Sequence, residues 1–540
     1  MLFRSLAGRL LGAAVLSATA SCTRPASPVV EGDRRQILLW GNGAEPQDLD
    51  PQTVTGVPEH HILTALLEGL VSEDPVDLHP VPGVAERWEV SPDGLVYTFH
   101  LRAGARWSNG DPVTAQDFVR SYQRMLTPSF AAQYAYMFYY VAGAEDFNQG
   151  RLADFSRVGF QAPDARTLQV TLRHPTPFLL SVMNHYSWFP VHLPTIEKFG
   201  GRSRGGTNWT RPGNFVGNGP FVLQEWRPGQ VITVTRSPTY WDRARVRLQE
   251  IRFYAVESSD TEERMFRSGE LHVTDTVPLS KIDTYRREQP AALHRDPYLG
   301  TYFYRLNITR PPLNDRRVRR ALALAIDRES LIRNVLHGGQ QPAYSLIPSI
   351  PTAGFVAQPW LHGNVAEARQ LLAAAGYPGG QGFPAVELLY NTLEDNRILA
   401  EAIQQMWRRN LGIEVRLVNQ EWKVYLDSER TMNYQIDRAG WIADYIHPQS
   451  FAELWVTNGG NNNTGFSNAE YDRVLAAIAS MKTNEERNAA YQRLDQILME
   501  EVPVIPLYFY VRSHLVTPEV KGYHPTLLDN HPWKYLYLER

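Results

Sequence analysis

A strand–helix–strand run in the second half of the chain constrains the fold more than any other part of the sequence. Residues 386–390 form an apolar run typical of a strand, and residues 398–411 carry apolar side chains at helical spacing before the helix-ending Gly412. Residues 413–418 predict a second strand. Strands joined by a crossover helix are parallel, and ligands bind at their carboxyl ends. The sequence therefore predicts an α/β fold with a ligand-facing edge between Asn391 and Asn396.

The rest of the chain predicts several domains of ordinary composition. A chain of 540 residues is too long for one hydrophobic core, and alternating patterns near residues 97–101, 167–172 and 251–255 predict strands in the first half. The 54 basic and 57 acidic residues give a net charge of -3. This balance provides no broad basic field, so we expect no nucleic-acid partner.

The first residues carry the pattern of an export signal. Arg4 and Arg9 precede and enter an apolar run that is too short to cross a bilayer, and no acidic residue occurs before Glu31. The remaining chain has no comparable apolar stretch. We therefore expect residues 1–21 to be a signal peptide and the mature body to lie in the periplasm or cell envelope.

Cys22 is the only cysteine of the chain, so it cannot form an internal disulfide. Together with Thr19, Ala20 and Ser21 it resembles the cleavage box of bacterial lipoproteins, although that family usually has Leu where Thr19 stands. The resemblance implies lipidation of Cys22, and the alternative is an ordinary cleaved signal with a chance cysteine. Under either interpretation we expect residues 22–36 to be a flexible tether.

One motif points to an enzyme. Gly201, Ser203 and Gly205 satisfy the G-x-S-x-G pattern of serine hydrolases, with Ser203 as the nucleophile. That chemistry needs a buried strand leading into a strained turn, whereas the residues on both sides are polar and Gly-rich. We interpret the motif as a solvated loop.

Metal and nucleotide sites are also not predicted. His60 and His61 are adjacent, and adjacent side chains on a helix point apart. No metal-ligand spacing of His or Cys occurs elsewhere, and the glycines of residues 217–220 lack the lysine of a phosphate-binding loop. We therefore expect neither a metal nor a cofactor.

One segment interleaves indoles with opposite charges. It contains Trp422, Arg438, Gly440, Trp441 and Asp444. A zwitterionic peptide needs a carboxylate for its ammonium, a cation for its carboxylate and backbone groups for its main chain, and the segment offers each kind. The alternative is that Arg438 and Asp444 form a structural ion pair and that the tryptophans belong to a core.

Many short motifs follow one another in order along the chain. They include Leu49-Asp50-Pro51, Glu68-Gly69-Leu70, Trp107-Ser108-Asn109-Gly110 and Arg438-Ala439-Gly440-Trp441. One such string could arise by chance, but so many in order could not. From about Trp40 to its end, the chain resembles the periplasmic oligopeptide-binding proteins, which are the peptide-binding subunits of ATP-driven importers (family 5 solute-binding proteins).

The resemblance implies a two-lobed periplasmic-binding-protein fold of type II, in its large cluster C form, with an extra inserted domain. Two strand crossings would join the lobes, which would enclose a peptide when they close. Lobe I would comprise residues 37–69, 193–298 and 512–540, the inserted domain residues 70–192, and lobe II residues 299–511.

The resemblance also implies roles for individual residues. Asp444 matches the residue that pairs with the α-ammonium of the peptide. Arg438 matches an arginine that serves the peptide carboxylate, directly or through its network. The remaining matches line the peptide or pair with its backbone: Val57, Tyr134, Trp422, Gly440, Trp441 and Tyr510.

The far end of the site departs from the best-known members of the family. Thr55 replaces a glutamate, and Leu336 and Asn396 replace a lysine and a histidine that can meet peptide carboxylates. Glu429 stands at the position of a second arginine, with Arg430 next to it. Since the ammonium anchor is kept while cations are lost, we expect peptide binding with altered length or carboxylate chemistry.

These observations predict a solute-binding receptor of an ABC transporter rather than an enzyme. It would capture short peptides between two closing lobes and deliver them to permease subunits in the inner membrane, acting as a monomer that touches the membrane only through a lipid on Cys22. The alternatives are a receptor for murein (cell-wall) peptides, a serine hydrolase that uses Ser203, and an envelope chaperone or adhesin.

Overall fold

The computed structural model describes residues 27–540. The predicted signal peptide and Cys22 lie outside these residues. Helix α1 (Pro28–Arg35) occupies most of the segment that the sequence assigned to a flexible tether, so that prediction is wrong for residues 28–35. Ser27 caps the helix by accepting a hydrogen bond from the backbone of Val30, and the buried side chain of Val29 packs in a small apolar cluster with Leu271.

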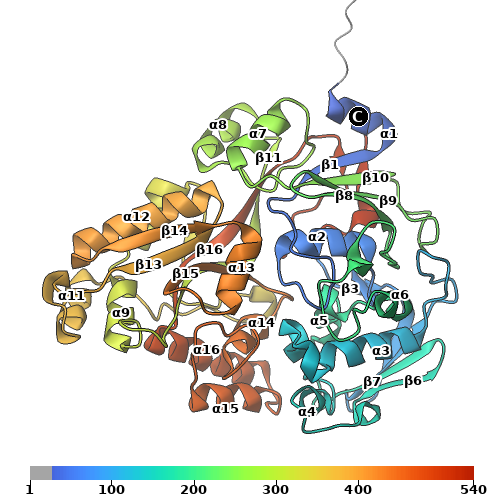
Figure 1. The fold of residues 1–540 in the computed structure, drawn as a ribbon, viewed down its shortest axis with the longest axis horizontal. Helices are drawn as coiled ribbons and strands as arrows, with labels where there is room; N and C mark the ends of the chain where they lie inside the picture. Colours follow the sequence, from blue (N-terminus) through green and yellow to red (C-terminus); the bar gives the residue numbers. More distant parts are fainter. Residues whose placement is uncertain (1–26) are drawn as a thin grey trace, which may run out of the picture.

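Lobe I contains a four-stranded sheet with the strand order β1-β10-β9-β8 (Figure 1). β1 runs parallel to β10, and the other neighbours are antiparallel. β1 is buried along its whole length, which agrees with its continuous apolar sequence. The elements of lobe I are β1 (Ile37–Gly41), α2 (Val57–Leu66), α6 (Leu193–Lys198), β8 (Phe221–Arg227), β9 (Val231–Arg236), β10 (Glu250–Tyr254), α7 (Ser259–Arg267), α8 (Ile282–Glu288), β17 (Val520–Lys521) and β18 (Tyr537–Leu538).

Residues 70–192, which we propose as the inserted domain, contain a separate antiparallel sheet with the order β4-β5-β7-β6. Helix α3 packs beside this sheet and begins with a capping box between Thr114 and Asp117. The elements are β2 (Val71–Glu73), β3 (Pro80–Pro82), β4 (Ala85–Val90), β5 (Val96–Leu101), α3 (Ala115–Leu126), α4 (Ala144–Asn148), β6 (Phe160–Asp164), β7 (Thr167–Thr171) and α5 (Leu179–Val182).

Lobe II contains a six-stranded mixed sheet with the order β12-β16-β11-β15-β13-β14. The predicted strand–helix–strand unit is confirmed, because β13 and β14 pair in parallel and α12 connects them in the chain. α12 begins four residues before the predicted start. The elements are α9 (Arg316–Leu324), α10 (Arg328–Leu331), β12 (Gln341–Pro342), α11 (Val365–Ala374), β13 (Val386–Asn391), α12 (Glu394–Leu411), β14 (Val415–Gln420), α13 (Trp422–Arg430), β15 (Ile436–Ile442), α14 (Gln449–Ala452), α15 (Ala469–Ile478) and α16 (Asn484–Glu501).

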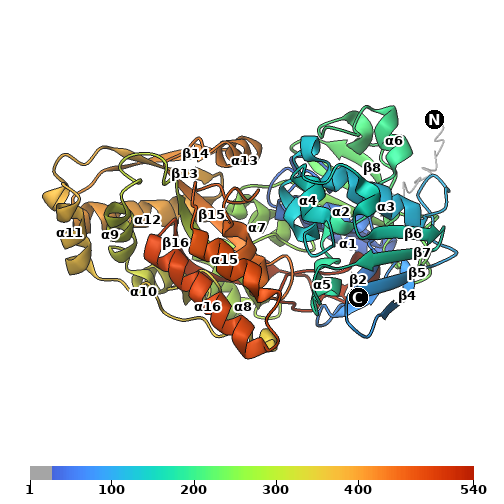
Figure 2. The ribbon, with the colours of Figure 1, turned by 90° about the horizontal axis from the view of Figure 1, so that it is seen from below.

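Two long antiparallel strands connect the lobes, β11 (Leu293–Leu306) and β16 (Val504–Leu515). Their pairing is interrupted between Pro297 and Thr301, and it resumes inside the sheet of lobe II. This interruption coincides with the boundaries at 298/299 and 511/512 that we propose between the lobes. Figure 2 shows lobe II on one side of the molecule and lobe I with the inserted domain on the other.

A fully buried ion pair joins the inserted domain to lobe I. The guanidinium of Arg124 on α3 lies 2.6 Å from the carboxylate of Asp50, and their side chains are 1% and 0% exposed. Arg124 also donates to the side chain of Gln52 and to the backbone oxygen of Gly201. No helix within residues 27–540 has the length and apolar character needed to cross a membrane.

Candidate ligand-binding cleft

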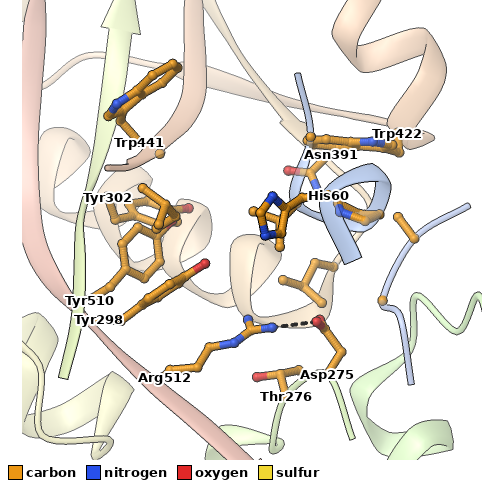
Figure 3. Close-up of a pocket in the computed structure, with 18 of the residues that line it drawn as sticks. His60, Asp275, Thr276, Tyr298, Tyr302, Asn391, Trp422, Trp441, Tyr510 and Arg512 are labelled. Carbon is orange, nitrogen blue, oxygen red and sulfur yellow. Dashed lines mark hydrogen bonds and ion pairs between the residues drawn. The ribbon is translucent and has the colours of Figure 1, made fainter. Parts of the chain in front are cut away.

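A cavity of about 480 Å³ lies between lobe I, lobe II and the inserted domain (Figure 3). Its volume falls within the range of roughly 300–1,000 Å³ that is usual for small-ligand sites. Lobe I contributes the start of α2, the inserted domain contributes the short helices Gln133–Phe138 and Tyr186–Trp188, and lobe II contributes β15, α13 and the start of α12.

All ten residues predicted for the peptide site line this one cavity. They come from all three parts of the protein, although most lie in lobe II. The substituted positions Thr55, Leu336 and Glu429 line it as well, together with Arg430. The ten predicted residues are Val57, Tyr134, Asn391, Asn396, Trp422, Arg438, Gly440, Trp441, Asp444 and Tyr510.

Asp444 follows β15 and presents its carboxylate where lobe II meets the inserted domain. Its side chain is 7% exposed. The Tyr134 hydroxyl donates to Oδ1 over 3.4 Å, and Nε2 of His185 lies 3.5 Å from the same oxygen. The other oxygen, Oδ2, is buried and has no hydrogen-bond partner among the described residues. Asp444 therefore keeps one acceptor atom available to a guest.

Among residues 27–540, no lysine or arginine lies at ion-pair distance from this carboxylate. Burial raises the pKa of Asp444 well above its ordinary value, and the negative charge of Glu453 raises it further. Burial also lowers the pKa of His185 well below its usual range, so this imidazole is neutral. An ammonium group at Asp444 would supply the missing positive charge.

Arg438 does not pair with Asp444, so the alternative of a structural ion pair between them is wrong. Its guanidinium donates to Oδ1 of Asn391 over 3.3 Å and to the Tyr510 hydroxyl over 3.0 Å, and it lies 4.5 Å above the ring of Tyr302. These partners are neutral. They orient the guanidinium along the cavity wall without neutralising its charge.

The other three arginines that line the cavity all have carboxylate partners. Arg305 pairs with Glu429, Arg430 with Asp427, and Arg512 with Asp275 and Asp529. Within residues 27–540, Arg438 is thus the single cavity-lining arginine without a carboxylate at ion-pair distance. Glu429 stands at the position where the resemblance places a second arginine. In this protein its carboxylate forms an ion pair with Arg305.

The predicted ligand-facing edge is stabilised by a chain of side-chain amides. Asn396 is 1% exposed and donates from Nδ2 to the backbone and side-chain oxygens of Asn391, while it accepts from the Tyr302 hydroxyl. Asn391 in turn accepts from Arg438. Asn396 therefore holds Asn391 and Tyr302 in place.

The side chain of Tyr510 on β16 approaches the backbone of Gly440 so closely that only glycine fits at this position. A Cβ atom at this position would collide with the hydroxyl of Tyr510, which accepts the hydrogen bond from Arg438. Glycine at 440 thus allows β16 to present Tyr510 to the guanidinium.

The sequence interpretation missed one wall of the cavity. Tyr298, His60, Asp275, Thr276 and Arg512 surround the part of the cavity drawn in Figure 3. Asp275 and Arg512 lie 237 positions apart and pair over 2.7 Å. No local pattern relates them, and His60 was considered only as a metal ligand.

The loop that carries Ser203 lies outside this cavity. Ser203 is exposed, the loop is irregular, and no strand leads into it. The strand–turn–helix context that a hydrolase nucleophile requires is absent at this position.

The fold and the cavity define a two-lobed solute-binding protein of the periplasmic type. The sequence pattern of bacterial extracellular solute-binding proteins, family 5, matches residues 79–463. The chain is also 38% identical to the periplasmic oligopeptide-binding protein OppA of Escherichia coli, over 99% of this chain and 98% of that protein. The chain belongs to solute-binding protein family 5.

Solved structures agree in fold over nearly the whole chain. The Haemophilus influenzae OppA complex with the peptide RPPGFSPFR has a TM-score of 0.89 at 35% identity, covering 94% of this chain and 99% of that one. The murein tripeptide-binding protein MppA of E. coli has a TM-score of 0.88 at 35% identity, covering 93% and 98%. These similarities confirm the predicted fold class.

A second structure of MppA distinguishes two arrangements of the lobes. The unliganded open form has a TM-score of only 0.62 at the same identity, covering 93% of this chain and 97% of that one. Since the sequence compared is the same protein, the difference from 0.88 reflects the relative position of the lobes. The structure described here thus resembles the peptide complex of OppA more closely than the open form of MppA.

Proposed function

We propose that this protein is the receptor of an ABC importer and captures short peptides in the closed cleft. One observation carries the proposal: Asp444 is a buried carboxylate that faces the cavity, and the described part of the chain gives its second oxygen no partner and its charge no lysine or arginine. A buried charge is stable only when it is paired, so an ionised Asp444 requires a positive group from the guest. The amino terminus is the positive group that all unmodified peptides share.

The other walls suit the rest of a peptide. Arg438 offers a guanidinium to the peptide carboxylate. β13 pairs with β15 only at Ile436 and Asp437, so the later residues of β15 can offer backbone groups on that side to the peptide main chain. The aromatic walls of Trp422, Trp441 and Tyr510 can contact side chains of differing shape. Recognition of termini and main chain gives tolerance to sequence, because every peptide has these groups.

A receptor for murein peptides is a second candidate, supported by the similarity to MppA. The charges of the cavity favour an ordinary oligopeptide, because one arginine, Arg438, is free of carboxylate partners among the described residues. A guest with several carboxylates would leave the others unpaired. Mass spectrometry of ligands that co-purify with the native protein tests this directly, and recovery of murein fragments alone would favour the second candidate.

The setting follows from the same function. The body would work in the periplasm as a monomer, dock on permease subunits of the inner membrane in its closed form, and remain attached to the membrane through a lipid on Cys22.

Members of the family are receptors, and we assign no reaction to Ser203. Incubation with peptides should give binding without cleavage, and cleavage that is lost in Ser203→Ala would contradict this.

Amidation of the peptide C-terminus should weaken binding to the wild-type protein by about tenfold or more, because a hydrogen-bonded contact to a charged group is worth roughly 1.5–3 kcal/mol. The same amidation should matter little in Arg438→Ala, and calorimetry with both peptides measures the difference. Arg397→Ala is the control, because Arg397 is exposed and pairs with Glu394 and Glu401 outside the cavity. Equal affinities of the wild type for the free and the amidated peptide would show that Arg438 is a structural residue and does not bind the peptide carboxylate.

A further inference from the structure

A second buried carboxylate lies behind Asp444. Glu453 is 7% exposed and follows α14 in lobe II. Its two oxygens accept hydrogen bonds of 2.7 Å from the hydroxyls of Tyr445, in the same lobe, and Tyr140, in the inserted domain. Both partners are neutral, so Glu453 is bonded but not compensated in charge.

The inserted domain meets lobe II around these two carboxylates. Tyr134 and His185 cover Asp444, Tyr140 bonds to Glu453, and the ring of Phe178 stacks on that of His447 with centroids 4.1 Å apart. The hydrogen-bonded residues are more than 300 positions apart in the chain. These contacts therefore form where the inserted domain closes on lobe II, and they bury both carboxylates as they form.

No neighbouring group compensates the two charges within the described chain. Burial raises the pKa of Glu453 to about 7 and that of Asp444 well above its ordinary value. Burial also lowers the pKa of His185 and His447 and raises that of the surrounding tyrosines, so these groups are neutral. Titratable and charged groups face the pair from both sides. The inserted domain contributes His185, Tyr134, Tyr136, Tyr140 and Tyr186, and lobe II contributes Tyr445, His447, Tyr471, Tyr491 and Arg487. Arg487 forms no ion pair with either carboxylate.

Closure over two ionised carboxylates without a cation is unfavourable, because each loses water and gains no opposite charge. Two events lower this penalty: a cation arrives at Asp444 and compensates one of the two charges, or the carboxylates take up protons. We propose that Asp444 and Glu453 form a charge-sensitive latch, so that the inserted domain closes on lobe II when the ammonium group of a guest occupies Asp444. The proposal rests on the peptide-binding function above, and Glu453 acts in it as a positioning residue through Asp444.

The latch gives closure without a guest a defined pH dependence. The folded, closed form binds these protons more tightly than the open form, so lowering the pH favours closure of the free protein. Raising the pH through about 7 ionises Glu453 and favours opening. With a peptide bound, the ammonium replaces the proton at Asp444, and closure persists at pH 8.

Small-angle X-ray scattering of the full chain, freed of ligand, tests the latch. The wild-type radius of gyration should be larger at pH 8 than at pH 5.5. Asp444→Asn and Glu453→Gln should be more compact than the wild type at pH 8 and should show a weaker pH response. Glu485→Gln is the matched control, because Glu485 is exposed at the start of α16, and it should behave as the wild type. Variants that keep the wild-type radius at both pH values would overturn the proposal.

A pair of tyrosines tests the contact itself. Tyr140→Phe removes the hydrogen bond to Glu453, whereas Tyr139→Phe removes one to Asn148 within the inserted domain. With a saturating peptide at pH 8, Tyr140→Phe should be less compact than the wild type, and Tyr139→Phe should match it. Equal compaction of both variants and the wild type would exclude Tyr140 from the latch.

Peptides with a blocked amino terminus separate this proposal from the function on which it rests. Trialanine should bind the wild type about 100-fold or more tighter than N-acetyl-trialanine, and Asp444→Asn should discriminate less than about tenfold. If neither trialanine nor a mixed peptide pool binds the wild type, the peptide-binding function fails. If trialanine binds while the neutral variants leave closure and its pH response unchanged, the function stands and the latch fails.

Discussion

Replacement of Asp444 by alanine is expected to weaken peptide binding by about two to three decades or more. Removal of one partner of a buried ion pair typically costs roughly 3–5 kcal/mol, because the remaining charge keeps its desolvation penalty without its partner. In this case the peptide ammonium would face the neutral His185 without the carboxylate that compensates its charge. Calorimetry with a mixed pool of tri- to pentapeptides measures the loss.

Asp77→Ala is the control for this experiment. Asp77 is also an aspartate, but its side chain is 66% exposed in a turn of the inserted domain and does not line the cavity. It should bind peptides as the wild type does, and circular dichroism should show that both variants are folded. Equal affinities of the wild type and Asp444→Ala would refute the assignment of Asp444 as the ammonium anchor.

Replacement of Asp50 by alanine should lower the free energy of unfolding by about 3–5 kcal/mol, because it leaves the buried guanidinium of Arg124 without a counter-charge. The pair is 2.6 Å apart and fully buried between lobe I and the inserted domain. Urea unfolding followed by tryptophan fluorescence should show an earlier transition. Because the protein has several domains, the inserted domain can unfold in a transition of its own.

An exposed ion pair provides the comparison. Asp427 and Arg430 lie 2.7 Å apart, but their side chains are 64% and 59% exposed. Exposed pairs contribute little to stability, since water solvates both charges well. Asp427→Ala should therefore leave the unfolding transition near that of the wild type. A similar shift in Asp427→Ala and Asp50→Ala would contradict the importance of burial at Asp50.

The predictions that rested on apolar spacing are confirmed for the strand–helix–strand unit, and the ordered motifs predicted the fold class correctly. The strand–helix–strand unit was predictable because apolar spacing differs between strands and helices, and β13, α12 and β14 follow that pattern. The ten site residues line one cavity because the motifs fix their positions along a known fold. Their individual roles in binding stay predictions until the variants above are measured.

Features that depend on tertiary contacts could not be predicted. The pairs Arg305–Glu429 and Arg512–Asp275 join residues far apart in sequence, and no local pattern links their members. Helix α1 was missed for another reason. Ser27 and Pro28 were available as an N-cap and a first helical residue, but the polar, Pro-containing composition of the segment suggested a tether.

The two strands that cross between the lobes, β11 and β16, have a consequence for the thermodynamics of capture. Two separate molecules that enclose a guest would lose translational and rotational freedom each time they met. Here the two halves of the cleft are held together covalently by β11 and β16, whose pairing is broken between Pro297 and Thr301, at the proposed boundary between the lobes. The binding free energy of a guest therefore has to offset only the change in lobe arrangement, and not the association of two separate molecules. The two lobes also meet in the same alignment each time the cleft closes.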